Sequence, residues 1–94
     1  MVFDFSEIAG VKDYTKKSEK SRELFYKDDK VFLVINKNTI EVRCDQKLSN
    51  LLKEKYESVM DSRYFGKNGI EIVLSNQLTK DELEDLVRLS YSLT

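Results

Sequence analysis

The chain has 94 residues, and 16 lysines and arginines stand against 17 aspartates and glutamates, which gives a formal net charge of −1. This length fits one small domain with a single core, and it excludes a two-domain enzyme with a cleft between lobes. The near-zero charge disfavours a strong non-specific polyanion binder, and the longest apolar run, residues 31–35, is far too short to cross a membrane.

The residue types on which many enzymes and metal sites depend are nearly absent. There is no histidine, and Cys44 is the single cysteine. An imidazole base, a histidine metal ligand and a zinc–thiolate site within one chain are therefore excluded. Cys44 cannot form an internal disulfide, and the first residues do not form a secretory leader, so we expect a reducing, cytoplasmic location. We expect no cofactor, no metal and no enzymatic activity.

Residues 1–22 differ in character from the rest of the chain. Residues 1–11 are apolar-rich and fit either one helical turn or an extended lid. Residues 12–22 carry five basic against two acidic side chains, a local charge of +3, which is typical of a solvated loop or a mobile segment. We therefore expect one domain over residues 1–94, with its core in residues 23–94.

Three antiparallel strands are predicted next. They cover residues 24–26, the uninterrupted β-branched run 31–35, which is typical of a central strand, and residues 40–44. Residues 28–29 and 36–38 are the turns between them.

Alternation in the third of these strands separates its two faces. Ile40, Val42 and Cys44 are predicted to point inward, and Glu41 and Arg43 outward. A buried cysteine usually behaves as a small hydrophobe, so we interpret Cys44 as a core residue rather than a catalytic nucleophile.

A helix and a hairpin follow. Asp45 is the expected N-cap of a helix, and the apolar stripe of that helix consists of Leu48, Leu51, Leu52 and Tyr56. Residues 58–65 are predicted to be extended. Residues 67–69 are predicted to form a tight turn, because Asn-Gly is a strong hairpin signal, and residues 70–74 alternate as the last strand.

The final helix is predicted from the residues at its start. Thr79 and Glu82 fit a capping box, and Leu78 and Leu83 fit a hydrophobic staple. The acidic residues there diverge around the helix, so we interpret them as a favourable helix start rather than a cation site: Asp81, Glu82, Glu84 and Asp85. The order β-β-β-α-β-β-α predicts an α+β fold, an antiparallel sheet of about five strands with the helices packed on one face.

Several short motifs stand in a distinctive order. Asp81-Glu82-Leu83 and Ser90-Tyr91 close the chain, and Lys67 precedes them. Upstream lie a hydrophobic strand, a turn and a helix start, at Val31–Val34, Val42, Cys44 and Asp45. Over about residues 24–94, with a weaker echo at residues 9–11, this order resembles the YjbR/MmcQ family of small bacterial proteins.

Two departures limit what this resemblance implies. Tyr64-Phe65-Gly66 stands where the family has His-Met-Asn, and Gly69-Ile70 stands where it has His-Trp, so no role of those side chains is carried over. Residues 1–11 stand in place of the family's N-terminal helix. The resemblance implies a CyaY-like (frataxin-like) fold, also described as a double-wing DNA-binding motif, and supplies no catalytic residues. The N-terminal domain of the competence regulator TfoX is the second similar family.

The first functional hypothesis, which depends mainly on this resemblance, is a nucleic-acid-binding or regulatory module. A basic loop and a hairpin would contact phosphates, with weak and salt-dependent binding of DNA; the candidate residues are Lys16, Lys17, Lys20, Arg22, Arg63, Tyr64, Lys67 and Asn68. Tyr64 would stack or pack in a groove. In the alternative, Tyr64 and Phe65 are cross-strand core pairs and the basic residues are solvated.

Two further hypotheses come from other classes. The second is a protein–protein interaction domain that uses the sheet face free of helices, where Tyr26, Tyr64 and Val73 would be exposed. The third, an enzyme or small-ligand binder, is disfavoured because acid–base and metal-binding groups are so few. The first hypothesis requires that residues 12–22 and the hairpin near Lys67 share one face.

Overall fold

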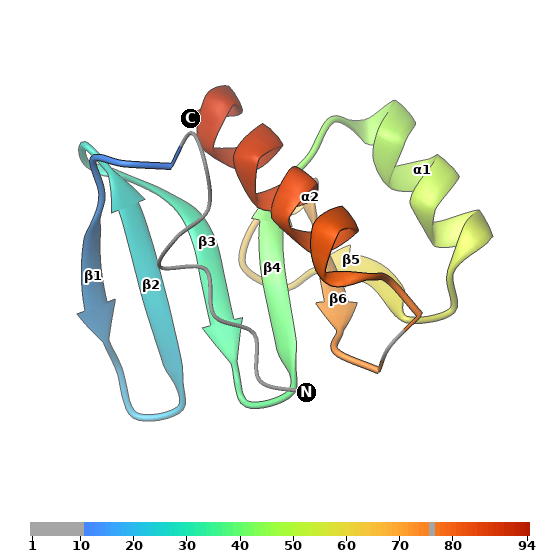
Figure 1. The fold of residues 1–94 in the computed structure, drawn as a ribbon, viewed down its shortest axis with the longest axis horizontal. Helices are drawn as coiled ribbons and strands as arrows, with labels where there is room; N and C mark the ends of the chain where they lie inside the picture. The colour runs from blue at the N-terminus through green and yellow to red at the C-terminus, as the bar shows by residue number, and fades with distance from the viewer. Residues whose placement is uncertain (1–10, 76) are drawn as a thin grey trace.

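The computed structural model describes residues 11–75 and 77–94, and in them one antiparallel sheet is covered on one side by two helices (Figure 1). The spatial strand order is β1-β2-β3-β4-β6-β5. The elements are β1 (Thr15–Ser18), β2 (Arg22–Lys27), β3 (Lys30–Asn36), β4 (Thr39–Arg43), α1 (Gln46–Lys55), β5 (Val59–Ser62), β6 (Gly66–Val73) and α2 (Lys80–Leu93). The predicted α+β fold with helices on one face is confirmed. The turn or lid predicted in residues 1–11 lies outside the described residues except for Val11, which is buried.

The sixth strand, β1, corrects the prediction of a loop over residues 12–22. It pairs antiparallel with β2, Thr15 opposite Tyr26 and Ser18 opposite Glu23. All four of its residues are exposed. A strand without apolar alternation gives no sequence signal, and here it is backbone pairing to the edge of β2 that makes the segment extended.

A β-bulge explains the continuous apolar run of β3. The register between β2 and β3 shifts after Phe25, which leaves Phe32 as an extra residue on β3. A bulge re-aims a side chain and interrupts the alternation of faces. Phe32 and Leu33 accordingly both join the helix-side core, whereas Val31 and Val34 join a smaller cluster on the other face. β3 is therefore buried on both faces, as predicted for a central strand.

The main core lies between the sheet and the helices. α2 packs over β3 and β4, and α1 packs over β5 and β6 (Figure 1). Ser90 of α2 is fully buried. Its hydroxyl donates to the Phe32 carbonyl and accepts from the Arg43 amide, which fastens the helix to two strands. Cys44 is buried in this core as predicted.

Both helices begin at the predicted caps. The Asp45 carboxylate accepts from the Leu48 amide at 2.8 Å, and Thr79 with Glu82 forms a complete capping box. The predicted stripe of α1 is too wide, however, since Leu51 is 56% exposed. α1 covers only the last two strands of the sheet, and a narrow contact of this kind buries fewer positions around a helix.

The prediction of a tight turn at residues 67–69 is wrong. β5 and β6 are joined by residues 63–65, and β6 starts at Gly66, whose φ of +62° places it in the left-handed region that favours glycine. Gly69 lies inside β6, where an added Cβ would stand 2.5 Å from the Val42 carbonyl oxygen and 2.6 Å from the Phe65 Cβ. Gly69 therefore allows Val42 and Phe65 to approach the backbone of β6 closely, and it does not form a turn.

Candidate functional site

The sheet face away from the helices carries one row of side chains that crosses all six strands. Residues opposite each other on antiparallel strands share a face, and the register links six such residues from β1 to β5: Lys17, Leu24, Val34, Glu41, Glu71 and Met60. The row is apolar in the middle of the sheet. Two glutamates stand side by side next to that apolar part, on β4 and β6.

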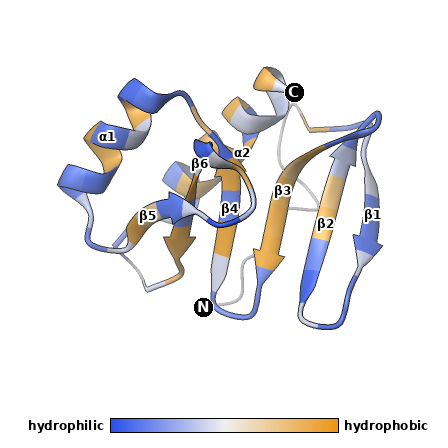
Figure 2. Ribbon diagram, turned by 180° about the vertical axis from the view of Figure 1, so that it is seen from behind, coloured by the Kyte–Doolittle hydropathy of each residue, from blue (hydrophilic) through white to orange (hydrophobic). Residues whose placement is uncertain are grey.

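Residues 62–65, which we call the 62–65 loop, fold across this open face beside β4 (Figure 2). The Ser62 hydroxyl and the Tyr64 amide both donate to Oε1 of Glu41, at 2.8 and 2.9 Å. The Phe65 amide donates to the Ser62 hydroxyl at 2.8 Å. The Phe65 ring packs against the apolar cluster of the open face, to which Val34 belongs. The loop is thus fastened by hydrogen bonds on one side and apolar contact on the other.

Glu41 points away from the helices, as predicted, but it is only 2% exposed. Asn36 donates to its second carboxylate oxygen at 2.9 Å. Burial acts to raise the pKa of Glu41. The hydrogen bonds from Asn36, the Tyr64 amide and Ser62, and the charge of Arg63, lower it further than burial raises it, so the pKa of Glu41 lies below its ordinary value. The covered carboxylate is therefore ionised at neutral pH.

Glu71 is the second buried carboxylate, 3% exposed. Arg63 binds it through two parallel hydrogen bonds, from Nε at 3.0 Å and from Nη2 at 2.8 Å, and the Thr39 hydroxyl donates to it at 2.8 Å. The bond to this carboxylate raises the pKa of Arg63. The Arg63 side chain is 74% exposed, and three of the five N–H donors of a guanidinium remain after two are used. Arg63 is anchored along one edge and presents the other edge to solvent.

Arg22, at the end of the basic segment, reaches the 62–65 loop. Its guanidinium carbon lies 5.5 Å from the centroid of the Tyr64 ring, and its Nε donates to Glu19 at 2.6 Å. A groove of about 330 Å³ lies between the two segments and is lined by Ser21, Arg22, Asn36, Glu41, Arg63 and Tyr64. The structure therefore brings three of the predicted site residues, from two distant segments, to one place.

Lys16 does not join them. It stands opposite Phe25, which belongs to the helix-side core, whereas Lys17 stands opposite Leu24 on the open face. Lys16 pairs instead with Glu23 at 3.0 Å. Neighbouring residues of a strand point to opposite faces, so the basic segment cannot act as one arm.

The remaining candidates are exposed. Lys20 lies between β1 and β2, and Lys67 and Asn68 lie at the start of β6. In the part of the chain that the structure describes, Lys17, Lys20 and Lys67 have no ion-pair partner. Of these three lysines, Lys17 lies on the open face opposite Leu24.

The sequence reasoning missed the buried polar network, which includes Asn36, Thr39 and Ser62 as well as the two glutamates. The available signal was a single glutamate between β-branched residues in two strands, Ile40-Glu41-Val42 and Ile70-Glu71-Ile72. Alternation places both glutamates outward, but it does not show that a loop covers them.

The exposed apolar face expected for a protein partner is only partly present. Tyr26 and Val73 are half-buried, and Tyr64 is 40% exposed. Among the described residues the other large exposed apolar side chains stand on three different elements: Leu51, Met60 and Leu93.

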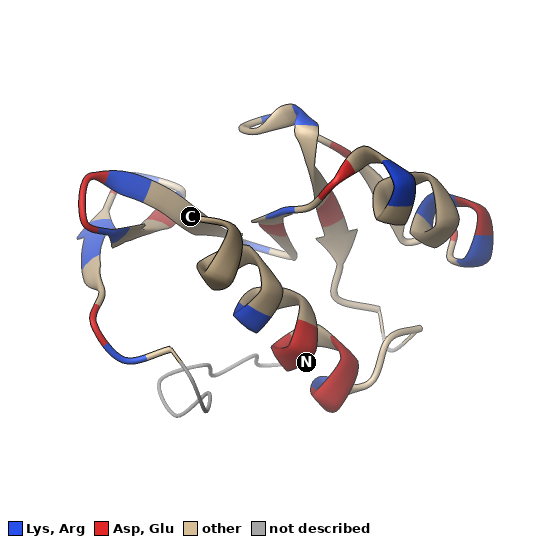
Figure 3. Ribbon diagram, turned by 90° about the horizontal axis from the view of Figure 1, so that it is seen from above, with Lys and Arg blue, Asp and Glu red and all other residues tan. Residues whose placement is uncertain are grey.

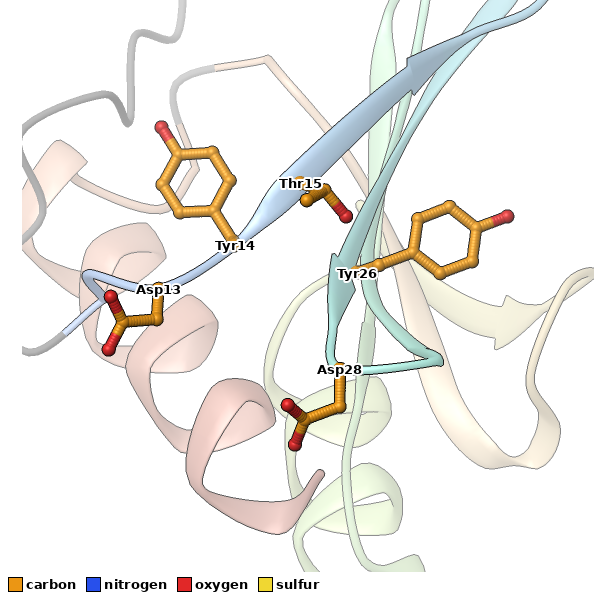
Figure 4. A pocket seen from close by; sticks show the side chains of 5 residues that line it. All are labelled: Asp13, Tyr14, Thr15, Tyr26 and Asp28. Atoms are coloured by element: carbon orange, nitrogen blue, oxygen red, sulfur yellow. The ribbon is translucent and has the colours of Figure 1, made fainter.

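A second hollow, of about 350 Å³, lies near the opposite end of β2 (Figure 4). It is lined by Asp13, Tyr14, Thr15, Tyr26 and Asp28. Its two carboxylates disfavour an anion, and further acidic residues gather at the start of α2 (Figure 3). The groove beside Tyr64 instead holds two guanidinium groups, which attract an anion, although the carboxylate of Glu41 also lines it.

The described residues show neither a metal site nor a membrane-spanning helix. Within residues 11–75 and 77–94, no three histidine, cysteine or acidic side chains gather in a way that could hold a metal ion. Over the same residues, no helix is long and apolar enough to span a membrane.

Comparison with known proteins gives one informative result. No family model and no curated protein sequence matches the chain. Among solved structures, the fold is similar to the crystal structure of the Deinococcus radiodurans protein DR2400, described as a DUF419 domain. The TM-score is 0.76 and the identity 14%, over 85% of this chain and 67% of that one. At this identity the likeness establishes a shared fold, that of a DUF419 domain.

Proposed function

We propose that this domain is a non-enzymatic nucleic-acid-binding or regulatory module that contacts phosphates through the open face of its sheet. The observation that supports this is the meeting of Arg22 with Arg63 and Tyr64 at one groove. Phosphate contacts in nucleic-acid complexes come largely from arginine, lysine and polar side chains. Three of the eight candidate residues line this groove, and one of them, Arg22, comes from the basic segment, which supports the proposal.

In the proposed mechanism, Arg63 is held in a fixed orientation, and three lysines contribute through their charge. Arg63 is held in place by Glu71 and turns its remaining donors outward, which suits the geometry of a phosphate. Lys17, Lys20 and Lys67 attract the backbone as unpaired charges. Because the net charge of the chain is −1, binding is weak, and because it comes from phosphate contacts, it falls as salt rises.

Kinship with the YjbR/MmcQ family is part of the same proposal. The order of the motifs in the sequence and the DUF419-like fold support it. We also place the protein in the bacterial cytoplasm, since its single cysteine is buried and unpaired and free thiols persist in a reducing compartment.

The test is the affinity for a labelled nucleic acid of mixed sequence as a function of salt. Four phosphate contacts, from Arg63 and the three lysines, predict a loss of about 50- to 150-fold between about 50 and about 200 mM salt. Lys17→Gln and Lys67→Gln are each expected to reduce the slope of log K against log salt by about 1. The matched control is Lys47→Gln, an exposed lysine on α1, which should leave the slope unchanged.

No binding at low salt, or an equal effect of all three substitutions, contradicts the proposal. A protein partner for the open face is then the remaining candidate function. It would be sought by pull-down with the wild-type chain and with Met60→Glu, because Met60 is 41% exposed on that face.

A further inference from the structure

We infer that the groove between Arg22 and the 62–65 loop holds one unpaired nucleotide, so the domain prefers single-stranded nucleic acid to a duplex. This inference rests on the proposed function and specifies the ligand of the same site. The size of the groove supports this inference. A volume of about 330 Å³ lies at the lower end of ligand pockets. It accepts one nucleotide, whereas a double helix can only touch its rim.

Charge is distributed unevenly inside the groove. The ionised carboxylate of Glu41 lines it together with the amide of Asn36, whereas the guanidinium groups of Arg22 and Arg63 belong to side chains with solvent-exposed surface. A phosphate is repelled by the carboxylate and attracted by the guanidinium groups. The uncharged base therefore takes the interior, and the phosphate stays at the arginines.

Tyr64 also favours an unpaired base. The residue is 40% exposed, and its ring lies nearly perpendicular to the neighbouring Phe65 ring, at 77° and 5.0 Å between centroids. No parallel ring is stacked on it among the described residues. The Arg22 guanidinium carbon lies over this ring, 5.5 Å from its centroid, so a base on that side stacks on the guanidinium plane or displaces it. Unpaired bases stack on exposed aromatic rings and on arginine planes, and bases paired within a duplex cannot reach such a ring.

The experiment measures the affinities for a labelled single strand and for the duplex of the same sequence, at one low salt concentration. We expect the single strand to bind about tenfold more tightly, the size of one base–aromatic stack. Tyr64→Leu should abolish this preference, because it weakens single-strand binding about tenfold more than duplex binding. Tyr64→Phe, which keeps the ring, should retain the preference. Lys67→Gln should weaken both ligands alike.

A second readout is independent of the leucine variant. The chain has five tyrosines and no tryptophan, so tyrosine fluorescence is directly observable. A single strand should quench it in the wild type, and Tyr64→Phe should remove that part of the quenching. If the duplex binds as tightly as the single strand, the inference is overturned while the proposed function stands. If neither ligand binds at low salt, both are overturned.

Discussion

The two faces of the sheet are buried by different means. On the helix side, apolar side chains of the strands meet those of α1 and α2, and Ser90 adds hydrogen bonds. On the open side, the 62–65 loop covers two carboxylates. Ser62 and Tyr64 donate hydrogen bonds to Glu41, and Arg63 forms an ion pair with Glu71. Burial on the first face follows from hydrophobicity, whereas burial on the second depends on every charged oxygen finding a donor.

This difference explains why the candidate site lies on the open face. Apolar packing leaves no polar group for a ligand. The network on the open face instead fixes Arg63 and the Tyr64 backbone while part of each side chain remains exposed. The contacts that close this face therefore also shape the groove.

The largest expected effect comes from matched valine truncations on the two faces. Val42 on the helix side and Val34 on the open side are both fully buried. We expect Val42→Ala to lower the free energy of unfolding by about 2–3 kcal/mol. Val34→Ala should cost about 1–2 kcal/mol, because the 62–65 loop can settle into the space that is left. Urea denaturation measures both free energies of unfolding. Equal losses would contradict the expectation that the 62–65 loop adjusts to a cavity more readily than the helices do.

The next effect tests how closely the loop approaches the sheet. Gly69→Ala places a methyl group against the Val42 carbonyl and the Phe65 side chain, and we expect a loss of about 1–2 kcal/mol. Gly66→Ala meets no atom within 4 Å, but its φ is +62°, so about 1 kcal/mol of backbone strain is expected.

Amide NMR separates these two glycine variants. Gly69→Ala should shift the signals of residues 62–65 as the Phe65 ring is displaced. Gly66→Ala should leave Phe65 in contact with the open-face cluster. If Gly69→Ala leaves the loop signals in place, the loop does not depend on this contact.

The smallest effect is expected on the stability of the protein at acidic pH. The pKa of Glu41 in the fold lies below its ordinary value near 4.5. Its ionised form therefore stabilises the protein above that value, and this contribution is lost as the pH falls through the lowered pKa. Glu41→Gln should flatten the decline of stability in this pH range. Glu57→Gln, an exposed position after α1, is the control and should preserve it. Thermal unfolding as a function of pH distinguishes the two.

Strong local patterns made much of the fold predictable. The cap at Asp45, the capping box at Thr79 and the alternation in residues 40–44 all specify structure through contacts within a few residues. β1 and the start of β6 were not predictable in this way. The strand β1 forms because β2 offers an unpaired edge. Gly69 lies in β6 opposite Arg43 of β4, where its lack of a side chain leaves room for Phe65.

The sequence by itself determined the fold class, the helix starts and the absence of histidine chemistry, because each depends on local periodicity or composition. Only the tertiary structure decided that Lys16 and Lys17 face opposite sides, that Glu41 and Glu71 are buried, and that Arg22 meets Tyr64. The physical reason is distance along the chain. Glu41 is covered by the amide of Tyr64, 23 residues away, and no local pattern records a hydrogen bond between two segments that meet only when the sheet has formed.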